Sequence, residues 1–483
     1  MRAMPTKFAL TLGAVLYSTT ALSAGTTLFD DVAPLTTPAV VVPEAQELTS
    51  PFVLPNTPTI VFHQQVIADR NTQLGLGQQN SGSADMIDTN RTGPDANRYL
   101  FMPFEPNYGG GVAGVDGSGV QRVDTWDANY NTRTVTLVNS LTDTFIRGDA
   151  SRWTPWGGWL TGEENTGTAG GVLHGRMFEL TNPVDATGPG DADFVHRNII
   201  PRVAHEGVAF DSLNNLYFID ELNGGSLYKY TAADPNAPDG NAFFGAGTVY
   251  VAKVDGGNNF GATGAVQWEA LTDAMGQVLP AYAAAVDAGT GDLVGDAAAN
   301  LALATEFNRP EDMEIATLGN GDEFLAFTAT GTHQIFGLDL TTGMMSVFAD
   351  RNTIDLATGL PVGTNLASPD NMAVDADGNL YIVEDQAAPK ADIWRAVDLN
   401  HDGDLLDAGE GLSRWIGLQT AGAEPTGLFF SLADPNVAYV NVQHPSSGND
   451  ALVRISAVPV PGAGLLMGGV LLGLVGVARR KRS

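Results

Sequence analysis

The stretch HEGVAFDSLNNLYFIDE occupies residues 205–221 and predicts a β-hairpin. Two apolar, strand-like runs flank the polar segment 211–215, which has the composition of a turn. In an antiparallel hairpin the start of the first strand lies beside the end of the second. Glu206, Asp220 and Glu221 should therefore gather at one edge of one sheet.

The same pattern returns as PDNMAVDADGNLYIVED at residues 369–385. Here Asp370 takes the place of the first acid, and Glu384 and Asp385 follow the second strand. The dipeptide Asp377-Gly378 is a strong turn signal between the two strands. The chain thus repeats one hairpin design, with acids at equivalent ends.

Looser copies occur elsewhere in the chain. Residues 309–315 enter a strand with Glu311 at the position of the first acid, and residues 159–164 end in paired acids. A further copy at 424–430 has Thr426 where the acid should be. Repeats of this kind predict an all-β fold, a β-propeller of about six blades with four strands in each.

In a propeller, equivalent positions of different blades lie on one face around one axis, so the repeated acids should converge on one mouth. Clustered carboxylates need counter-charge, because each ionised neighbour raises the pKa of the others. Oxygen-only ligands favour hard cations, above all calcium. The alternative is that these acids are ordinary solvated loop residues. The predicted convergent set is Glu163, Glu164, Glu206, Asp220, Glu221, Glu311, Asp370, Glu384 and Asp385.

The composition limits the function classes. The 483 residues include 24 Lys and Arg against 55 Asp and Glu, a formal charge of −31. This balance argues against a nucleic-acid partner, which requires a basic footprint. The absence of Cys excludes disulfides, thiolate metal sites and Cys nucleophiles.

Both ends of the chain carry export signals. Residues 1–24 have a basic start, an apolar run and a small-residue end, which predicts a secretory signal peptide. At the other end, residues 458–462 contain a Val-Pro-Val-Pro motif, residues 463–478 are apolar, and four basic residues follow. This order resembles the PEP-CTERM family of sorting signals at residues 458–483. The resemblance implies recognition by an exosortase of a protein in the periplasm, at the cell surface or outside the cell, first anchored in the inner membrane by a transmembrane helix at 463–478.

The predicted propeller spans residues 96–457, after an extended N-terminal lead-in at 25–95. The strand-like run at 59–62 in that lead-in is a candidate for closing the last blade. Residues 232–308 are predicted to be partly an insertion, with Ala-rich helical segments at 281–288 and 297–306.

A separate motif predicts a second calcium site in a loop between blades. Oxygen-bearing side chains stand at positions 1, 3, 5 and 7 of a calcium-loop pattern, with Gly403 at position 6. Position 12 is Gly409 instead of the EF-hand Glu, so a plain Asp/Asn/Gly turn is the alternative. The predicted ligands are Asp398, Asn400, Asp402 and Asp404.

Seven short motifs, taken together and in order, resemble the PhoX-type alkaline phosphatases over roughly residues 95–455. The motifs are TPWGGWLTGEEN (154–165), HEG (205–207), RPED (309–312), SPDN (368–371), VED (383–385), EPTG (424–427) and VNVQHP (440–445). The resemblance implies a propeller enzyme that hydrolyses phosphate monoesters outside the cytoplasm. It also implies a calcium-rich cofactor that includes a pair of irons.

Carried over by motif, Glu206 and Glu311 would be metal ligands, and Arg309 would bind the substrate phosphate as the catalytic arginine. Ligand candidates implied by the remaining motifs are Glu163, Glu164, Asp370, Asn371, Glu384 and Asp385. The chain departs from the family at Gly162, where the family has an iron-binding Cys. The calcium part of the cofactor needs only oxygens, whereas the iron part loses its thiolate.

The sequence is compatible with three functions. The first is a metal-dependent phosphatase that acts on a small phosphate ester. The second is a non-catalytic, calcium-stabilised surface or matrix propeller, which Gly162 and the sorting tail favour. The third is a calcium-dependent lactonase or esterase.

Overall fold

The repeated hairpins form as predicted. The structure is a computed structural model that describes residues 27–106, 117–139, 144–169 and 171–460. β13 (His205–Phe210) pairs with β14 (Leu216–Asp220), and β27 (Pro369–Val374) pairs with β28 (Leu380–Glu384). In both turns an Asp carboxylate accepts a backbone N–H four residues later, at 2.7 Å in the first and 3.0 Å in the second. The local Asp-to-Asn spacing therefore closes both hairpins.

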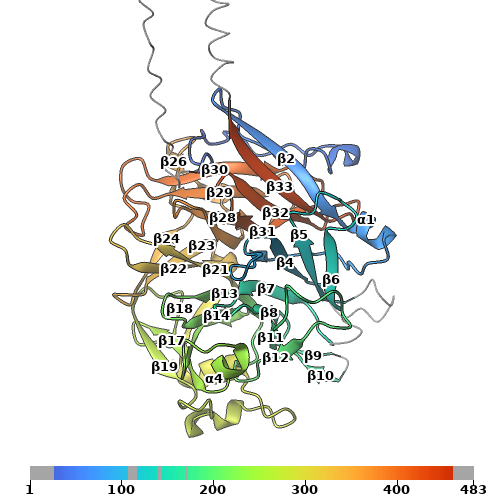
Figure 1. Cartoon of the computed structure of the whole chain (residues 1–483). Coiled ribbons are helices and arrows are strands. Elements are labelled where there is room, and N and C mark those ends of the chain that lie inside the picture. The colour runs from blue at the N-terminus through green and yellow to red at the C-terminus, as the bar shows by residue number, and fades with distance from the viewer. Residues whose placement is uncertain (1–26, 107–116, 140–143, 170, 461–483) are drawn as a thin grey trace, which may run out of the picture.

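Within the described residues, six four-stranded antiparallel units surround one axis as the blades of a propeller, and the first strands of successive blades lie against one another (Figure 1). Blade 1 consists of β3 (Asp88–Thr89), β4 (Tyr99–Phe104), β5 (Gly119–Asp124) and β6 (Thr134–Asn139). Blade 2 consists of β7 (Gly148–Trp153), β8 (Trp159–Glu163), β11 (Met177–Leu180) and β12 (Phe194–His196). Blade 3 consists of β13, β14, β16 (Leu227–Ala232) and β17 (Gly247–Val254).

Blade 4 consists of β21 (Pro310–Thr317), β22 (Glu323–Ala329), β23 (Gln334–Asp339) and β24 (Met344–Ala349). Blade 5 consists of β27, β28, β29 (Asp392–Val397) and β30 (Gly411–Leu418). Blade 6 consists of β31 (Glu424–Phe430), β32 (Val437–Gln443), β33 (Ala451–Pro459) and β2 (Ile60–Asp69). The predicted all-β propeller of about six blades is confirmed.

The first two strands of each blade are sandwiched between neighbouring blades. All five residues of β14 and of β28 are buried, and so are all six of β7. Strands that are covered on both faces carry continuous apolar runs, which explains LYFI in blade 3 and LYIV in blade 5. The axis is therefore lined by rigid, buried backbone.

The N-terminal segment closes the ring. β2 pairs with β33 from Ile60 opposite Pro459 to Asp69 opposite Ala451, which confirms that the strand-like run at 59–62 completes the last blade. Phe29 packs against Trp415 with ring centroids 5.2 Å apart. The propeller thus recruits β2 and β3 from residues that the sequence predicted to be an extended lead-in.

Short strands and helices lie outside the four-stranded blades. β19 (Gly264–Ala270) pairs with β17 and β24 and so joins blades 3 and 4. The others are β1 (Phe52–Val53), β9 (Thr168–Ala169), β10 (Val172–Leu173), β15 (Asn223–Gly225), β18 (Asn259–Phe260), β20 (Thr305–Asn308), β25 (Ile354–Asp355), β26 (Leu360–Pro361), α1 (Arg70–Gly75), α3 (Gly240–Phe243) and the short 3-10 helices η1 (Glu44–Gln46), η2 (Pro280–Ala285), η3 (Thr330–Thr332) and η4 (Gly363–Asn365).

The segment predicted as an insertion is divided between blade and insertion. β17 within it is the outer strand of blade 3, whereas η2 and α4 (Gly295–Ala302) form the expected helical part. Throughout the described residues, no helix has both the length and the apolar character needed to cross a membrane. The predicted signal peptide and the predicted helix at 463–478 lie outside the described residues.

Candidate metal and phosphate site

Carboxylates meet where the first strands of the blades begin. Glu206 starts from β13, Glu311 from β21 and Asp370 from β27, and one oxygen of each lies within 4.8 Å of the others. Two further acids belong to the same site, because Asp85 and Asp149 both interact electrostatically with Asp370. Blades 1 to 5 thus each contribute one acid.

A shared backbone irregularity aims these side chains. The pairing of β13 with β14 shifts register between His205 and Val208, and β21 and β27 shift at the equivalent places. β7 and β31 carry the same kind of shift, next to Asp149 and Thr426. A bulge inserts one extra residue and turns a side chain away from the ordinary alternation. The bulges therefore point the acids toward the axis.

A second ring of acids follows the second strands. Arg147 pairs with two of them, Glu105 after β4 at 3.0 Å and Glu164 after β8 at 2.9 Å. Glu221 after β14 and Asp385 after β28 occupy the corresponding places, and Glu424 at the start of β31 interacts with Asp385. We call these ten acids the mouth cluster: Asp85, Glu105, Asp149, Glu164, Glu206, Glu221, Glu311, Asp370, Asp385 and Glu424.

Burial and mutual repulsion both oppose ionisation in the mouth cluster. Removal from water raises the pKa of Glu206, Glu311 and Asp370 well above the ordinary value, and neighbouring carboxylates raise it further. Burial likewise raises the pKa of Glu424 to about 9, helped by its hydrogen bond and charge interaction with Asp385. Such groups are stable as anions only next to positive charge.

Several oxygens of the mouth cluster have no hydrogen-bond donor among the residues that the structure describes. They are one oxygen each of Asp85, Glu164, Glu311 and Asp370, all buried. Glu311 has a cation nearby, since the Arg309 guanidinium lies 3.1 Å from that oxygen without hydrogen-bond geometry. Buried acceptors without partners are costly, and a bound hard cation would satisfy them.

Arg309 lies beside the cluster, as its predicted phosphate-binding role requires. Its guanidinium donates to Glu221 from Nε at 3.1 Å and from Nη2 at 2.6 Å. The side chain is 40% exposed, so one side of the guanidinium remains open to a ligand. Its backbone is in the left-handed region, with φ of 48°, a strained conformation for an arginine.

Glu163, Glu384 and Asn371 are not brought to the mouth cluster. Glu163 accepts ion pairs from His174 at 2.8 Å and Arg176 at 2.7 Å, and these partners lower its pKa although burial raises it. Consecutive strand residues point to opposite faces, so Glu163 turns away where Glu164 turns in.

The other two have partners of their own. Glu384 accepts the backbone N–H groups of Ala367 and Asp392 at 2.8 and 3.1 Å. Asn371 accepts the N–H of Gly427 at 2.7 Å. Asp220 also serves the backbone, since it accepts the N–H of Ala204 at 3.0 Å.

The predicted second calcium loop lies on the outer edge of blade 5, between β29 and β30, and not between two blades. Asp398 accepts the N–H groups of Asp402 and Gly403 at 3.3 and 3.0 Å. Asn400 donates to Asp402 and to Asp407, both at 2.9 Å. These contacts form a closed, turn-rich loop, and its calcium binding stays a prediction.

The position of the missing Cys is closed by a neighbouring blade. A Cβ atom at Gly162 would lie 2.2 Å from the Cβ of His205. His205 is fully buried, and its burial lowers its pKa to about 3. A thiolate at 162 would need the blades to move apart. The residues present fit a hard cation held by oxygens and do not fit thiolate-bound iron.

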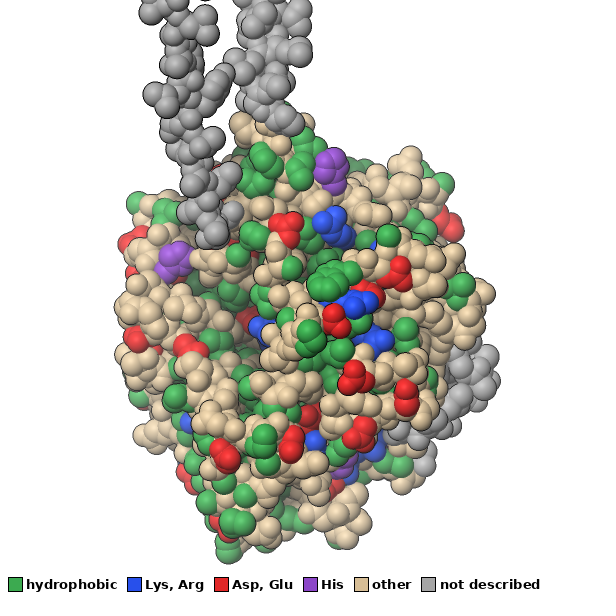
Figure 2. Space-filling model, in the orientation of Figure 1, with side chains coloured by type: hydrophobic (Ala, Val, Ile, Leu, Met, Phe, Trp, Pro, Cys, Tyr) green, Lys and Arg blue, Asp and Glu red, His purple; other side chains and the backbone are tan. Residues whose placement is uncertain are grey.

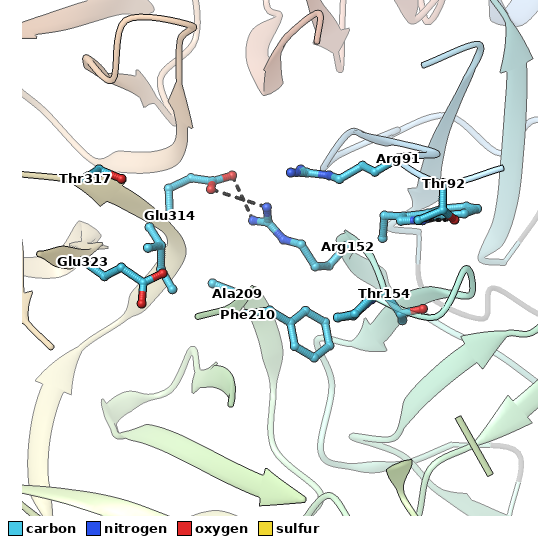
Figure 3. A pocket seen from close by; sticks show the side chains of 12 residues that line it. Arg91, Thr92, Arg152, Thr154, Ala209, Phe210, Glu314, Thr317 and Glu323 are labelled. Atoms are coloured by element: carbon cyan, nitrogen blue, oxygen red, sulfur yellow. Dashed lines mark hydrogen bonds and ion pairs between the residues drawn. The ribbon is translucent and has the colours of Figure 1, made fainter. Parts of the chain in front are cut away.

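The opposite ends of the same strands form a different site. A cavity of about 340 Å³ lies there, lined by late residues of β7, β13 and β21 and by Arg91 (Figure 3). Arg152 points across it to Glu314, with 2.9 Å between Nη2 and the carboxylate, and donates to the carbonyl of Val208 at 2.6 Å. This pair, with Arg152 buried and Glu314 half-buried, links blades 2, 3 and 4 at the end opposite the mouth cluster.

Asp85, Glu105, Asp149, Glu424 and Arg147 were not among the predicted site residues. A signal for two of them was present, because Arg147-Gly148-Asp149 has the same offset from basic to acidic residue as Arg309-Pro310-Glu311. Asp85 precedes a strand of two residues, too short to show a pattern. Acidic side chains are also scattered over the surface (Figure 2), so acidity alone could not have singled these out.

These features define a class of protein: a six-bladed propeller with a buried carboxylate cluster and an arginine at one mouth. The alkaline phosphatase PhoX family matches residues 149–446, more than half of the chain, and the chain belongs to that family. Membership supports a metal-dependent phosphoric monoester hydrolase as the favoured function over the non-catalytic and esterase alternatives.

The solved structures to which the chain is similar share little sequence with it. Virginiamycin B lyase from Staphylococcus aureus is 13% identical, with coverage of 82% of this chain and 99% of that one and a TM-score of 0.42. A luciferin-regenerating enzyme is 10% identical, with 79% and 94% coverage and a TM-score of 0.39. Aldose sugar dehydrogenase from Streptomyces coelicolor is 11% identical, with 82% and 99% coverage and a TM-score of 0.36. No curated protein sequence matches the chain.

Proposed function

We propose that the chain is an exported phosphatase that hydrolyses phosphate monoesters at the mouth cluster with calcium as its cofactor. The observation that carries the proposal is the convergence of Glu206, Glu311 and Asp370 within 4.8 Å, next to Arg309. Their donor set is all oxygen, and oxygens of Glu311 and Asp370 accept no hydrogen bond. Calcium takes six to eight such ligands in flexible geometry.

The ligands of this site would be Glu206, Glu311 and Asp370, with Glu164 and Asp385 at its edge. A cation held there would polarise a phosphoryl oxygen as a Lewis acid. The burial of these carboxylates lowers the local dielectric constant, which strengthens the charge interactions at the phosphoryl group. Arg309 would bind phosphoryl oxygens with its planar fork and stabilise the charge that develops on them.

Arg309 can exchange its present carboxylate partner for a phosphoryl group. Its guanidinium donates to Glu221 from Nη2 at 2.6 Å and from Nε at 3.1 Å. A phosphoryl group offers the guanidinium a better partner, because its oxygens carry more charge and match two donors at once. Thiolate-bound iron has no part in this proposal, since Gly162 supplies no ligand and His205 fills its surroundings.

Elemental analysis together with an activity assay tests the function. The purified full chain is measured by inductively coupled plasma mass spectrometry and assayed with 4-nitrophenyl phosphate at alkaline pH. Calcium without stoichiometric iron, and turnover that Arg309→Ala reduces by about 10²- to 10³-fold, is the expected result. Exposed Glu44→Gln is the control. A metal-free protein without turnover would contradict the proposal, and stoichiometric iron would contradict its cofactor.

Export rests on the terminal sequences, which lie outside the described residues. We propose that residues 1–24 direct secretion, and that the PEP-CTERM-like segment 458–483 holds the protein at the inner membrane until an exosortase acts on it. Cell fractionation with and without residues 458–483 tests this. The truncated chain should leave the membrane fraction, and its retention there would exclude the tail as the anchor.

We also propose a structural calcium at Asp398, Asn400, Asp402 and Asp404. Its support is the spacing of the four oxygen-bearing side chains and the left-handed Gly403 at the turn, with φ of 87°. Asp402→Asn should remove one calcium equivalent without a change in turnover. An unchanged calcium content would identify the loop as a plain turn.

A further inference from the structure

Arg147 occupies the same place in blade 2 that Arg309 occupies in blade 4. Each arginine directly precedes the first strand of its blade, β7 or β21, and stands two residues before an acid of the mouth cluster. Each has its backbone in the left-handed region, with φ of 43° at Arg147 and 48° at Arg309. Ser368, which directly precedes β27, shares this rare conformation with φ of 46°, so it is a geometry that the blades repeat, and blades 2 and 4 place an arginine in it.

The backbone hydrogen bonds of the two arginines correspond one to one. The carbonyl of Arg147 accepts the N–H of Glu164, and that of Arg309 accepts the N–H of Thr330, each from the residue after the second strand of its own blade. Both distances are 2.9 Å. The N–H groups of the arginines donate to Pro106 and Leu222, both at 3.3 Å, each shortly after the second strand of the preceding blade.

The side chains also correspond. Nη2 of Arg147 pairs with Glu105 at 3.0 Å and Glu164 at 2.9 Å, whereas Nη2 of Arg309 pairs with Glu221 at 2.6 Å and Glu311 at 3.1 Å. The two side chains are 30% and 40% exposed, so both reach the open side of the mouth cluster.

Two observations indicate that Arg147 has capacity for a ligand. Among the residues that the structure describes, its Nε finds no hydrogen-bond acceptor, although the guanidinium stands among carboxylates. Glu221, which Arg309 binds directly, also interacts with Arg147 through its charge. The two guanidinium groups therefore flank the same part of the mouth cluster from neighbouring sides.

We propose that Arg147 and Arg309 together bind the phosphoryl group of the substrate and select dianionic phosphate monoesters over phosphodiesters. This inference rests on the proposed phosphatase function. An anion that enters a mouth lined by ten carboxylates meets repulsion, which grows with its charge. Two guanidinium forks offset that repulsion, and a dianion with three free oxygens can use both. A phosphodiester carries one charge and two free oxygens, so it gains less from the second arginine.

Phosphate binding by the calcium-loaded full chain tests the inference without turnover. Isothermal titration with inorganic phosphate compares the native protein with Arg147→Gln and Arg147→Lys. We expect Arg147→Gln to weaken binding by about 10- to 100-fold, the loss of one charged hydrogen-bonding partner, and Arg147→Lys to recover part of it. The matched control is Arg98→Gln, because Arg98 also pairs with two carboxylates, Asp95 and Asp124, and is 28% exposed.

Kinetics then test the selectivity. Arg147→Gln should lower kcat/KM for 4-nitrophenyl phosphate at least tenfold more than for bis(4-nitrophenyl) phosphate, with a larger change in KM than in kcat. If Arg147→Gln lowers the melting temperature as much as Arg98→Gln while phosphate affinity stays within twofold of native, Arg147 is only a brace between blades. Native protein that binds phosphate in an Arg147-dependent manner but turns over no ester would refute the phosphatase and leave the two-arginine site standing.

Discussion

The two mouths of the propeller, the mouth cluster at one end of the strands and the Arg152–Glu314 pair at the other, balance their charges in different ways. At the start of β21, Glu311 has a buried oxygen without a hydrogen bond, and burial raises its pKa. Three residues later, Glu314 receives the Arg152 guanidinium at 2.9 and 3.4 Å. The Arg152 guanidinium balances Glu314 at its end, whereas in the mouth cluster Arg147 and Arg309 stand against ten carboxylates and, among the described residues, leave buried oxygens without a hydrogen bond.

This difference follows from the cost of charge in a low-dielectric interior. A buried ion pair with hydrogen bonds is a tolerable structural element, and here Arg152 also satisfies the carbonyl of Val208. A cluster of buried carboxylates without enough cations stores repulsion that only protonation or a bound cation relieves. The Arg152–Glu314 pair is therefore a structural brace, and the mouth cluster at the other end of the same strands is the candidate binding site.

The sharpest test compares Glu311→Gln with Glu314→Gln on β21. Glu311→Gln should reduce turnover by about 10³-fold, because it removes a carboxylate that would hold the cofactor. Glu314→Gln should keep turnover within a few-fold of native and instead lower the melting temperature. Activity assays and thermal scans of both variants decide. Equal losses of activity would mean that the two mouths do not differ in function.

Metal removal should have the next largest effect. When the free concentration of a cation is a thousand times its Kd, its binding stabilises the folded state by about 4 kcal/mol. We expect chelation to lower the melting temperature of the native chain markedly and to do so much less in Glu311→Gln. Differential scanning calorimetry with and without a chelator measures both. If chelation does not change the melting temperature of the native protein, the mouth cluster binds no stabilising metal ion.

Breaking the brace should cost stability alone. Arg152→Met leaves Glu314 without its arginine partner and removes one donor from the carbonyl of Val208, which should lower the free energy of unfolding by about 2 kcal/mol. The double variant Arg152→Met/Glu314→Leu should regain most of that loss, since no charge stays unpaired. Denaturant unfolding measures both, and metal content should stay native. Loss of bound metal in Arg152→Met would show that the two mouths are coupled.

The smallest effect concerns pH. Burial raises the pKa of Asp220 to about 7 from its ordinary value of 3.8, so the folded state holds a proton that the unfolded state has released. The stability this group contributes is full below pH 3.8 and is lost as pH rises through about 7, by about 1.4 kcal/mol per unit.

Unfolding of the metal-free protein between pH 4 and 7 measures this loss. Asp220→Asn should flatten the fall in stability over that range, and Asp31→Asn, at an exposed position, should not. Identical slopes for native protein and Asp220→Asn would contradict the proton linkage.

Much of the site could be predicted because it repeats. The match between residues 205–221 and 369–385 placed Glu206 and Asp370 at equivalent positions, and Glu311 followed from a looser copy. The structure brings the three together. Glu163 and Glu164 were predicted as a pair, but adjacent strand residues face opposite sides, and only the pairing of β8 shows which one turns inward.

The sequence by itself determined the hairpins, the propeller class, the acidic strand starts and the missing thiolate at Gly162, because each depends on local pattern or residue identity. Tertiary structure decided which acids meet and that Arg147 joins Arg309 at the mouth. It also decided that Arg152 braces the opposite end and that His205 closes the space beside Gly162. These features depend on how bulges aim side chains and how neighbouring blades pack, and such long-range geometry leaves no periodic trace along the chain.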